Sequence, residues 1–362
     1  MGPGLASHGH ERTRRVEAMA GYQKFLQVGV ALDPIHVGAG GAQIGRVDLT
    51  IVRDPVTQVP KIPGSSLAGV YRTYVAMAYE EDRQASQSGQ QSQGRQKPFY
   101  PDCAGLGLDQ NRGHCRQPDC PVCTVFGFAR GAGQEGGFAG LAAFTDAHVL
   151  LFPVPTRQGP MWVTAPMALK AIGLTVNGVN DNAVYVENPG SPLNLGWLLL
   201  ETRQCNQNVK QKLESLKIPD SIQNRLALVP DHLFAHIVNS NLEVRTSVSI
   251  NPETGAAEEG ALFSYEALPR GTVLVWEIIA KNPAYFQISG QRIAISNPEG
   301  VHDVTKKAHP YLEHLGIGGM GTRGMGRVKV VYSGSDSGPG AQQSQAQSVN
   351  PTSPANQGGG QP

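Results

Sequence analysis

The 362-residue chain lacks any apolar run near the roughly 20 residues that a membrane span requires. Its first twenty residues, MGPGLASHGHERTRRVEAMA, also lack the apolar stretch of a secretory signal peptide. We therefore expect a cytoplasmic protein with no membrane partner. An excess of one charge is missing too, because 30 Lys and Arg face 29 Asp and Glu. A nucleic-acid partner would thus have to meet a local basic surface, and not a globally basic protein.

Cysteine is scarce, with five in the chain, yet four of them fall within the stretch DCAGLGLDQNRGHCRQPDCPVC. In a cytoplasmic protein such thiols are expected to be metal ligands before disulfides. The spacing favours Cys103, Cys115, Cys120 and Cys123 as zinc ligands, with His114 as the alternative fourth ligand. Four protein ligands leave no open position on the metal, so the predicted Zn²⁺ is structural and clips an insertion that has little core of its own.

Glycine and proline are frequent, at 44 and 26 residues, which predicts many turns and loops. Two polar, low-complexity stretches have almost nothing to bury and are predicted to be disordered. The predicted divisions are a flexible N-terminal extension (1–20), a single domain (21–332) with a disordered insert (82–97), a zinc-binding insertion (98–128), a second insertion (150–235) and a hairpin region (242–270), and a disordered tail (333–362).

The remaining pattern is that of an α+β protein. Strands are predicted at 22–32, at 47–52, where VDLTIV alternates, and at 271–280, and a helix is predicted with Ser65 or Ser66 as its N-cap. The succession of strands and helices fits a ferredoxin-like (RRM-like) core with large insertions better than a doubly wound sheet.

The glycine-rich stretch GIGGMGTRGMGR at 316–327 precedes the last predicted strand. Glycines leave backbone N–H groups unshielded, so such a loop can approach a polyphosphate backbone and bind its shape and charge. Arg323 and Arg327 add positive charge. The alternative is a flexible crossing loop. The glycines of HVGAGG do not make a dinucleotide site, because the next segment alternates as a strand and no helix follows.

Several segments, in this order, resemble one family: HVGAGG, IGRVDLTIVRDPVTQVPKIPGSSLAGVYR, CPVCTVFG, LLFPVPTRQGPMWVTAP, NLEVRTSVSINPETGAAEEGALFSYEALPRGT and GIGGMGTRGMGRV. Together they are similar to the RAMP superfamily and, within it, to the repeated backbone subunit of type III CRISPR effector complexes. The segment with Phe-Pro-Val and Trp-Val-Thr is Cmr-like, whereas the zinc cluster is Csm-like. The likeness spans residues 22–332.

The resemblance implies a subunit that binds a guide (crRNA) together with other copies of itself and other type III subunits. It further implies a β-hairpin thumb within 242–270 that wedges the guide–target duplex. Complementary target RNA is then cleaved at regular intervals with a divalent metal, and the cleavage-associated aspartate of the family matches Asp48. The alternative is a non-catalytic structural guide-RNA-binding subunit of the same kind of complex.

The chemistry of RNA supports a simple site, because each ribose carries its own nucleophile, the 2′-OH. Alignment of that oxygen with the scissile phosphorus can contribute roughly 7–11 kcal/mol. Asp48 is expected to be a carboxylate at neutral pH and to bind Mg²⁺ or Mn²⁺, which neutralises charge on the phosphate. The alternative for Asp48 is a structural ion pair with Arg46 or Arg53. His36 is expected either to act as an acid or base or to form a hydrogen-bonded turn.

An RNA surface is also expected from the positions of the family motifs. For Phe263 and Tyr265, stacking on bases and packing in the core are equally expected. Where the family usually has a lysine after Ser-Ser-Leu, this chain has Ala68, which weakens the side-chain charge of that turn. The candidate RNA-binding residues are His36, Arg46, Arg53, Ser65, Ser66, Arg72, Arg245, Phe263, Tyr265, Arg323 and Arg327.

Overall fold

The structure is a computed structural model that describes residues 21–40, 47–87, 97–105, 113–129, 136–179, 182–205, 208–258 and 260–335. The predicted N-terminal extension, residues 88–96 of the predicted insert and residues 336–362 of the predicted tail lie outside this part, as does Arg46. No helix in the described ranges combines the length and apolar character that a membrane crossing requires.

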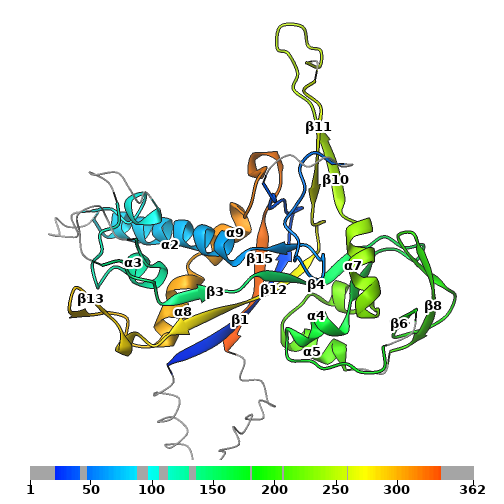
Figure 1. Cartoon of the computed structure of the whole chain (residues 1–362), viewed down its shortest axis with the longest axis horizontal. Helices are drawn as coiled ribbons and strands as arrows, with labels where there is room; N and C mark the ends of the chain where they lie inside the picture. Colours follow the sequence, from blue (N-terminus) through cyan, green and yellow to red (C-terminus); the bar gives the residue numbers. More distant parts are fainter. Residues whose placement is uncertain are drawn as a thin grey trace, which may run out of the picture.

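The fold is organised around an 11-stranded sheet (Figure 1). In order across the sheet, its strands are β15 (Val328–Ser335), β1 (Tyr22–Ala31), β12 (Val273–Lys281), β4 (Ala147–Val154), β5 (Met161–Thr164), β9 (Leu226–Leu228), β6 (Ala183–Val186), β8 (Leu198–Gln204) and β7 (Leu193–Leu195), with β2 (Lys61–Ile62) beside β4 and β3 (Ala142–Phe144) beside β12. β1 pairs antiparallel with both β12 and β15. Two short pairs stand apart, β10 (Glu243–Ser247) with β11 (Phe263–Ala267) and β13 (Gln287–Ile288) with β14 (Gln291–Arg292).

Helices and short 3₁₀ turns connect these strands. They are α2 (Gly64–Gln87), η1 (Asp102–Ala104), α3 (Pro121–Phe126), α4 (Pro166–Lys170), α5 (Val209–Ser215), α6 (Asp220–Gln223), α7 (Asp231–Ser240), η2 (Pro283–Tyr285), α8 (Pro298–Lys306), α9 (His309–His314) and η3 (Gly321–Arg323). Along the chain, β1, α2, β4, β12, α8 with α9, and β15 follow one another as strand, helix, strand, strand, helix, strand. Ferredoxin-like folds share this element order. The expected α+β class is confirmed.

The central sheet is covered on both faces. On one face Phe25 of β1 shares a core with Tyr71 of α2 and with residues of α3 and α8. On the other face Leu26 and Val28 share a second core with Leu169 of α4 and with α5. Because neither face meets water, β1 is buried without a break from residue 25 to residue 31, and the polar–apolar alternation of a half-exposed strand is absent.

Helix α2 begins one residue before the predicted N-cap positions and ends six residues inside the predicted disordered insert, so both predicted boundaries are wrong. At its start the Gly64 N–H donates to Asp146 Oδ1 at 2.8 Å, and the cap therefore comes from a residue 82 positions away. At its end Asp82 pairs with Lys307 Nζ at 2.8 Å, and the same ammonium lies 4.9 Å from the Tyr79 ring. The helix thus continues over a sequence of low hydrophobicity, and the Lys307 contact anchors it at Asp82.

Two further boundaries are corrected by strand pairing. The second insertion was predicted to begin at residue 150, but residues 150–154 belong to β4, where Leu151 pairs with Val273 of β12. The tail was predicted to begin at residue 333, but β15 continues to Ser335, which pairs with Phe25. In both places main-chain pairing with a buried strand outweighs the polar or proline-containing composition of the segment.

Glycine at position 64 is required by the close approach of α2 to β3. A Cβ added there would overlap the Phe144 carbonyl oxygen and lie 3.1 Å from Thr145 main-chain atoms. We expect Gly64→Ala to lower the free energy of unfolding by about 1–3 kcal/mol, the usual cost of overpacking. Gly69→Ala in the same helix is the matched control, because nothing lies within 4 Å of its added Cβ. It should raise stability by about 0.5–1 kcal/mol. Denaturant unfolding of both variants measures the difference, and equal effects would contradict the packing argument.

Candidate functional site

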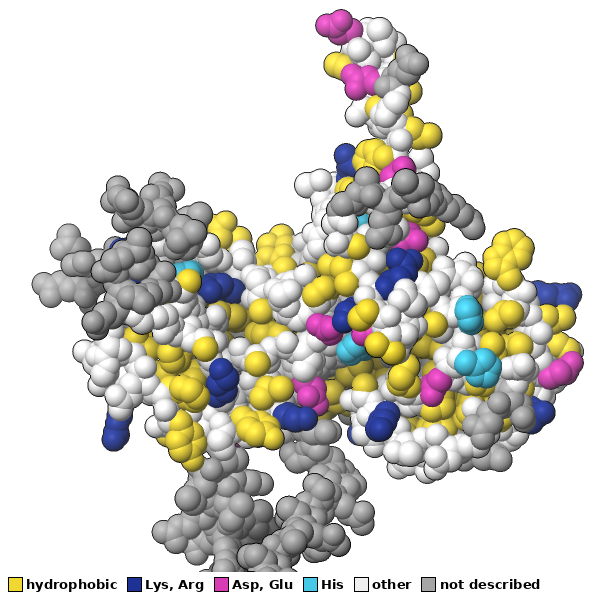
Figure 2. Space-filling model, viewed as in Figure 1, with side chains coloured by type: hydrophobic (Ala, Val, Ile, Leu, Met, Phe, Trp, Pro, Cys, Tyr) yellow, Lys and Arg dark blue, Asp and Glu magenta, His cyan; other side chains and the backbone are white. Residues whose placement is uncertain are grey.

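A β-hairpin formed by β10 and β11 projects away from the sheet (Figure 1). The strands are antiparallel, with Thr246 opposite Ser264, and beyond them Ile250 and Ala257 form a further bridge. In Figure 2 the hairpin carries hydrophobic side chains along its length and acidic side chains at its outer end. The exposed hydrophobic residues are Val244, Val248, Ile250 and Leu262, and Glu253 and Glu258 are exposed acidic residues. The hairpin lies inside the predicted 242–270 region.

The segment at 47–53 lies along β11 at the base of this hairpin. Residues 47–52 were predicted to be a strand, but the segment forms only isolated bridges, because its hydrogen bonds go to three different neighbours, which are β11, residues 37–39 and residues 60–61. On one side the Leu49 N–H donates to the Ser264 carbonyl at 3.0 Å and the Leu49 carbonyl accepts from the Glu266 N–H at 3.0 Å. On the other side the Val52 N–H donates to the Val37 carbonyl at 3.0 Å. The segment is thus fixed although it has no regular ladder.

Asp48 is exposed at this base, and its carboxylate is held by Ser264 of β11. Its Oδ2 accepts from the Ser264 N–H at 2.7 Å and from the Ser264 hydroxyl at 2.8 Å. These two hydrogen bonds hold the pKa of Asp48 below its usual range, so the side chain is a carboxylate at neutral pH. The structure pairs Arg53 with Glu266 and not with Asp48, and Arg46 lies outside the described residues.

Arg53 belongs to a polar network and does not form an open RNA surface. Its Nη2 pairs with Glu266 Oε2 at 2.8 Å, its Nε donates to Asn239 Oδ1 at 2.9 Å and its Nη1 donates to the Ile51 carbonyl at 3.1 Å. With three nitrogens occupied inside the protein, the predicted phosphate contact is wrong for this arrangement. The network instead joins the 47–53 segment to β11 and α7.

His36 is buried behind the same strand, with only 5% of its surface exposed. Its Nδ1 lies 2.6 Å from the Glu266 carbonyl oxygen, so the ring donates a hydrogen bond there. The ring also meets Tyr265 edge to face at 5.9 Å. The hydrogen-bonded turn is therefore the interpretation that fits, and the predicted RNA contact through this side chain is wrong. Tyr265 is 3% exposed, so it packs in the core and is not available for base stacking.

Other predicted RNA-binding residues lie near the hairpin or at the start of α2. Phe263 is half-buried, and the exposed Arg323 guanidinium lies 5.4 Å from its ring. Arg245 pairs with Glu243 at 2.6 Å on β10. Arg327 pairs with Asp33, with 3.1 Å between Nη2 and Oδ1. Ser65 is exposed and Ser66 half-buried in the first turn of α2.

Three glycines of the 316–327 loop, Gly316, Gly318 and Gly326, serve close packing, and the predicted set of unshielded N–H groups is wrong for much of this loop. A Cβ at Gly318 would overlap the His36 carbonyl oxygen, and the Gly319 N–H donates to that oxygen at 2.8 Å. The N–H groups of Gly316, Ile317 and Gly326 also donate to main-chain carbonyls. The loop is therefore neither a flexible crossing nor a free anion-binding nest along these residues.

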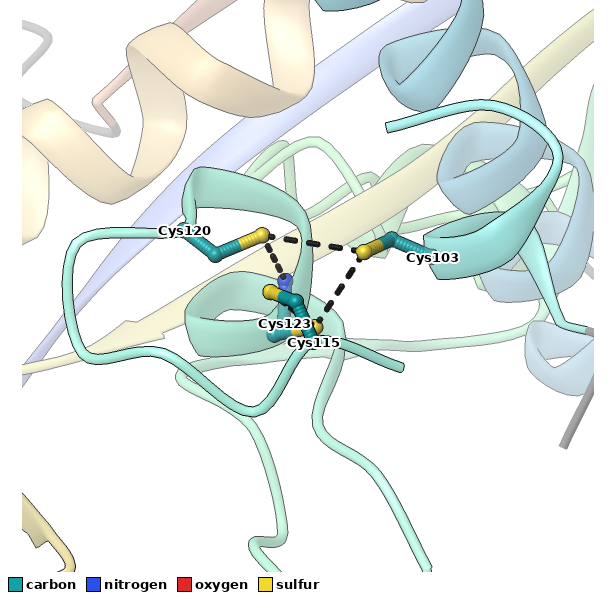
Figure 3. Close-up of side chains that lie close together, drawn as sticks. All are labelled: Cys103, Cys115, Cys120 and Cys123. Atoms are coloured by element: carbon teal, nitrogen blue, oxygen red, sulfur yellow. Dashed lines mark hydrogen bonds between the residues drawn. The ribbon is translucent and has the colours of Figure 1, made fainter. Parts of the chain in front are cut away.

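A second group of functional side chains is the cysteine cluster (Figure 3). Cys103 comes from η1, Cys115 and Cys120 from the segment before α3, and Cys123 from α3 itself. The four Sγ atoms lie within 4.8 Å of one another. The Sγ atoms of Cys115 and Cys123 are 3.6 Å apart, those of Cys123 and Cys103 are 3.7 Å apart, and those of Cys120 and Cys103 are 4.0 Å apart. A tetrahedron with metal–sulfur bonds of about 2.3 Å has sulfur–sulfur edges of roughly 3.8 Å. The four thiols therefore fit a metal such as zinc.

Arg72 and His114 support this cluster from outside. Arg72 Nε donates to the Cys103 carbonyl at 2.8 Å, and its Nη2 lies 2.8 Å from His114 Nδ1. Burial and the neighbouring Arg72 charge lower the pKa of His114 to about 4, so the neutral ring accepts the hydrogen bond from Arg72. The alternative of His114 as a ligand is thus wrong, and so is the predicted RNA contact of Arg72, whose side chain points into the protein.

Sequence reasoning missed Ser264, Glu266 and Asn239. Each is an ordinary polar residue in a strand or helix, and each gains its importance from a partner about 180 to 220 positions away. Only Glu266 stands out in its local sequence, because it is a charged residue between Tyr265 and Ala267, both of which are buried.

The sequence is similar to those of known proteins. A family model described as the RAMP superfamily matches residues 30–329. The chain is 25% identical over 322 residues to the CRISPR system Cmr endoribonuclease Cmr4 of Pyrococcus furiosus, covering 83% of this chain and 92% of that protein. It is 45% identical over 49 residues to the CRISPR system Cms endoribonuclease Csm3 of Streptococcus thermophilus, which is 13% of this chain and 22% of that protein.

Solved structures share the fold. A chain in the cryo-EM structure of type III-B Cmr-beta in the apo state has a TM-score of 0.55 at 16% identity, covering 85% of this chain and 96% of that chain. Oligomeric Cmr4 from Pyrococcus furiosus has a TM-score of 0.52 at 18% identity, covering 87% of this chain and 99% of that chain. The large sheet with its insertions is therefore common to this chain and to those proteins.

The cluster geometry predicts that metal loading and folding are linked. Cys120→Ser should lose bound metal and lower the melting temperature by more than about 5 °C, because metal binding contributes several kcal/mol to folding. Cys205→Ser is the control, since Cys205 lies outside the cluster. Elemental analysis of the purified protein and thermal unfolding measure the two effects. If Cys120→Ser keeps a full complement of metal, the four-thiolate site is refuted.

Proposed function

Because the chain belongs to the RAMP superfamily, we propose that it is a guide-RNA-binding backbone subunit of a type III CRISPR effector complex that also cleaves complementary target RNA at regular intervals. The observation that carries this proposal is the exposed, ionised Asp48 at the base of a projecting hairpin, in a chain that matches Cmr4 over 92% of that protein's length. Its partners are then the guide (crRNA), the target RNA, other copies of this chain and other type III subunits.

The hairpin is the proposed thumb. Its exposed aliphatic side chains, including Val248 and Ile250, suit contact with the faces of bases more than contact with phosphates. Its outer end carries Glu253 and Glu258, which repel a phosphate backbone. We infer that the thumb acts as a steric wedge that opens the guide–target duplex and bends the target strand at its base.

Cleavage then follows from the geometry of RNA at that bend. A displaced nucleotide brings its 2′-OH into line with the neighbouring phosphorus. The 2′-oxygen gives its proton to water and bonds to the phosphorus, the bond from phosphorus to the 5′-oxygen of the next nucleotide breaks, and that oxygen takes a proton from water. Both hydrogen bonds from Ser264 go to Asp48 Oδ2, so they leave Oδ1 for another partner. One carboxylate suits Mg²⁺ or Mn²⁺, which keep several waters, and the bound ion supplies positive charge that stabilises the transition state.

His36 has a supporting role in this proposal. Its Nδ1–H is committed to the Glu266 carbonyl and its ring is buried, so proton transfer to the RNA is not assigned to it. It holds β11 against the glycine-rich loop, whose Gly319 N–H donates to the His36 carbonyl. His36 therefore fixes the strand to which Asp48 is attached.

We further propose that the cysteine cluster binds a structural Zn²⁺. Four thiolates around one Zn²⁺ carry a net charge of about −2, and the half-buried Arg72 guanidinium adjoins this charge through the Cys103 carbonyl. The site has no open position, so the metal would join η1 to α3 and the segment before it within the 98–128 insertion and would take no part in cleavage. Cytoplasmic localisation, as expected from the sequence, agrees with reduced thiols.

One observation favours a second function. The hydrogen bonds between Asp48 and Ser264 would by themselves tie the 47–53 segment to β11. Asp48 would then be a structural residue in a guide-RNA-binding subunit that does not cut. The two functions differ in whether the charge of Asp48, and not only its hydrogen-bonding shape, is needed.

Asp48→Asn separates these functions, because the amide oxygen can still accept from Ser264 while the negative charge is lost. We expect target cleavage in the reconstituted complex to fall at least about 100-fold under Mg²⁺ or Mn²⁺, as loss of a metal-binding charge predicts. Guide content and target affinity should stay unchanged. Asp303→Asn on α8 is the control, since it removes an exposed carboxylate far along the chain.

Gel analysis of end-labelled target gives the cleavage rate and spacing, and filter binding gives the affinities. Cleavage at the wild-type rate by Asp48→Asn would rule out the catalytic role. Loss of guide binding together with cleavage would instead assign Asp48 the structural role.

A further inference from the structure

Three successive residues of β11 hold the segment that carries the candidate catalytic carboxylate. Ser264 binds Asp48, Tyr265 bridges to Leu49, and Glu266 pairs with Arg53 and accepts from the Ile51 N–H at 3.4 Å. These residues belong to the inner end of the thumb hairpin. Asp48 is therefore held by the thumb strand, whereas the far end of its segment also meets the sheet, where the Lys61 N–H of β2 donates to the Val52 carbonyl at 3.0 Å.

Ser264 forms three hydrogen bonds with Asp48. Its N–H and its hydroxyl both donate to Oδ2, at 2.7 and 2.8 Å, and its hydroxyl oxygen lies 3.2 Å from the Asp48 N–H, from which it accepts. The hydroxyl thus contacts both the main chain and the side chain of the same residue. A main-chain N–H alone would fix one atom of the carboxylate, whereas the hydroxyl adds a second direction and so restricts rotation of the carboxylate plane.

We propose that Ser264 is a positioning residue for cleavage: its hydroxyl fixes Asp48 Oδ2 so that Oδ1 is presented to the divalent cation in one orientation. This inference rests on the proposed function, because it matters only if Asp48 binds the cation. An exposed aspartate samples several side-chain rotamers, and a cation that must first select one of them binds more weakly. Groups that orient a metal ligand typically change metal affinity or activity by about 10–100-fold when removed.

The thumb context explains why this residue matters beyond one hydrogen bond. Ser264 is half-buried and lies directly opposite Thr246 of β10, so its main chain is fixed by the hairpin ladder. The ion pair between Glu266 and Arg53, at 2.8 Å, fixes the far end of the 47–53 segment to the same strand. A rigid strand therefore supports the hydroxyl on one side and the carboxylate segment on the other.

The test uses Ser264→Ala in the reconstituted complex with its guide. Target cleavage is measured in single turnover at saturating target while MgCl₂ or MnCl₂ is titrated. We expect the metal concentration for half-maximal rate to rise about 10-fold or more, and the rate at low metal to fall about 10–100-fold. Guide content and target affinity should not change. Ser264→Thr keeps the hydroxyl and should restore the wild-type metal dependence.

Ser247→Ala is the matched control, because this hydroxyl lies on the same hairpin but contacts the Tyr265 hydroxyl, at 3.4 Å, and not Asp48. It should behave as the wild type. If Asp48→Asn abolishes cleavage while Ser264→Ala follows the wild-type metal curve, the positioning role is refuted and the proposed function survives. If Asp48→Asn still cuts, the proposed function itself fails. Loss of guide loading in Ser264→Ala would make the hydroxyl a structural requirement and would also overturn the positioning role.

Discussion

The attachment of the 47–53 segment to β11 is the constraint on which the candidate site depends. This segment is too short and too irregular to hold itself, since its main-chain hydrogen bonds are divided among β11, residues 37–39 and Lys61 of β2. Asp48 is the acidic residue of this segment, and its exposed carboxylate contacts Ser264 of the hairpin. The body of the protein contributes by fixing the base of the hairpin, where Tyr265 and Ala267 are buried. In the proposed function, the sheet therefore supports the strand that positions Asp48.

Much of the fold could be predicted from local pattern. The buried strand at 271–280 and the helix after Pro63 follow from hydrophobic periodicity, and the α+β class follows from their order. The coverage of the second face of β1 could not be predicted, because it depends on α4 and α5, which are more than 100 residues away in the chain. The continuation of α2 to Gln87 was likewise not predicted, and the ion pair of Asp82 with Lys307 cannot be read from the composition of that stretch.

The two parts of the candidate site differ in how far the sequence predicts them. The four cysteines of the cluster are close in the chain, so their spacing favours them as ligands, but His114 stayed an alternative that only its contact with Arg72 in the structure removes. Asp48 could be singled out only through the family resemblance, and its partner Ser264 lies 216 positions away. Contacts at that separation leave no periodic signal. The same limitation explains why Arg53 was predicted at an RNA surface although Glu266 neutralises it inside the protein.

The surroundings of Arg72 limit which amino-acid replacements this family can accept near the cysteine cluster. Its guanidinium is half-buried on α2 between the Cys103 and Gly127 carbonyls and the His114 ring. Without thiolates nearby, a cation in that place would lack a compensating charge, which is costly in a partly dry environment. A lineage that abandons the four cysteines should therefore replace this arginine by a neutral residue as well. Across related sequences the four cysteines and Arg72 are expected to be gained and lost together. Asp48 and Ser264 are expected to vary independently of them.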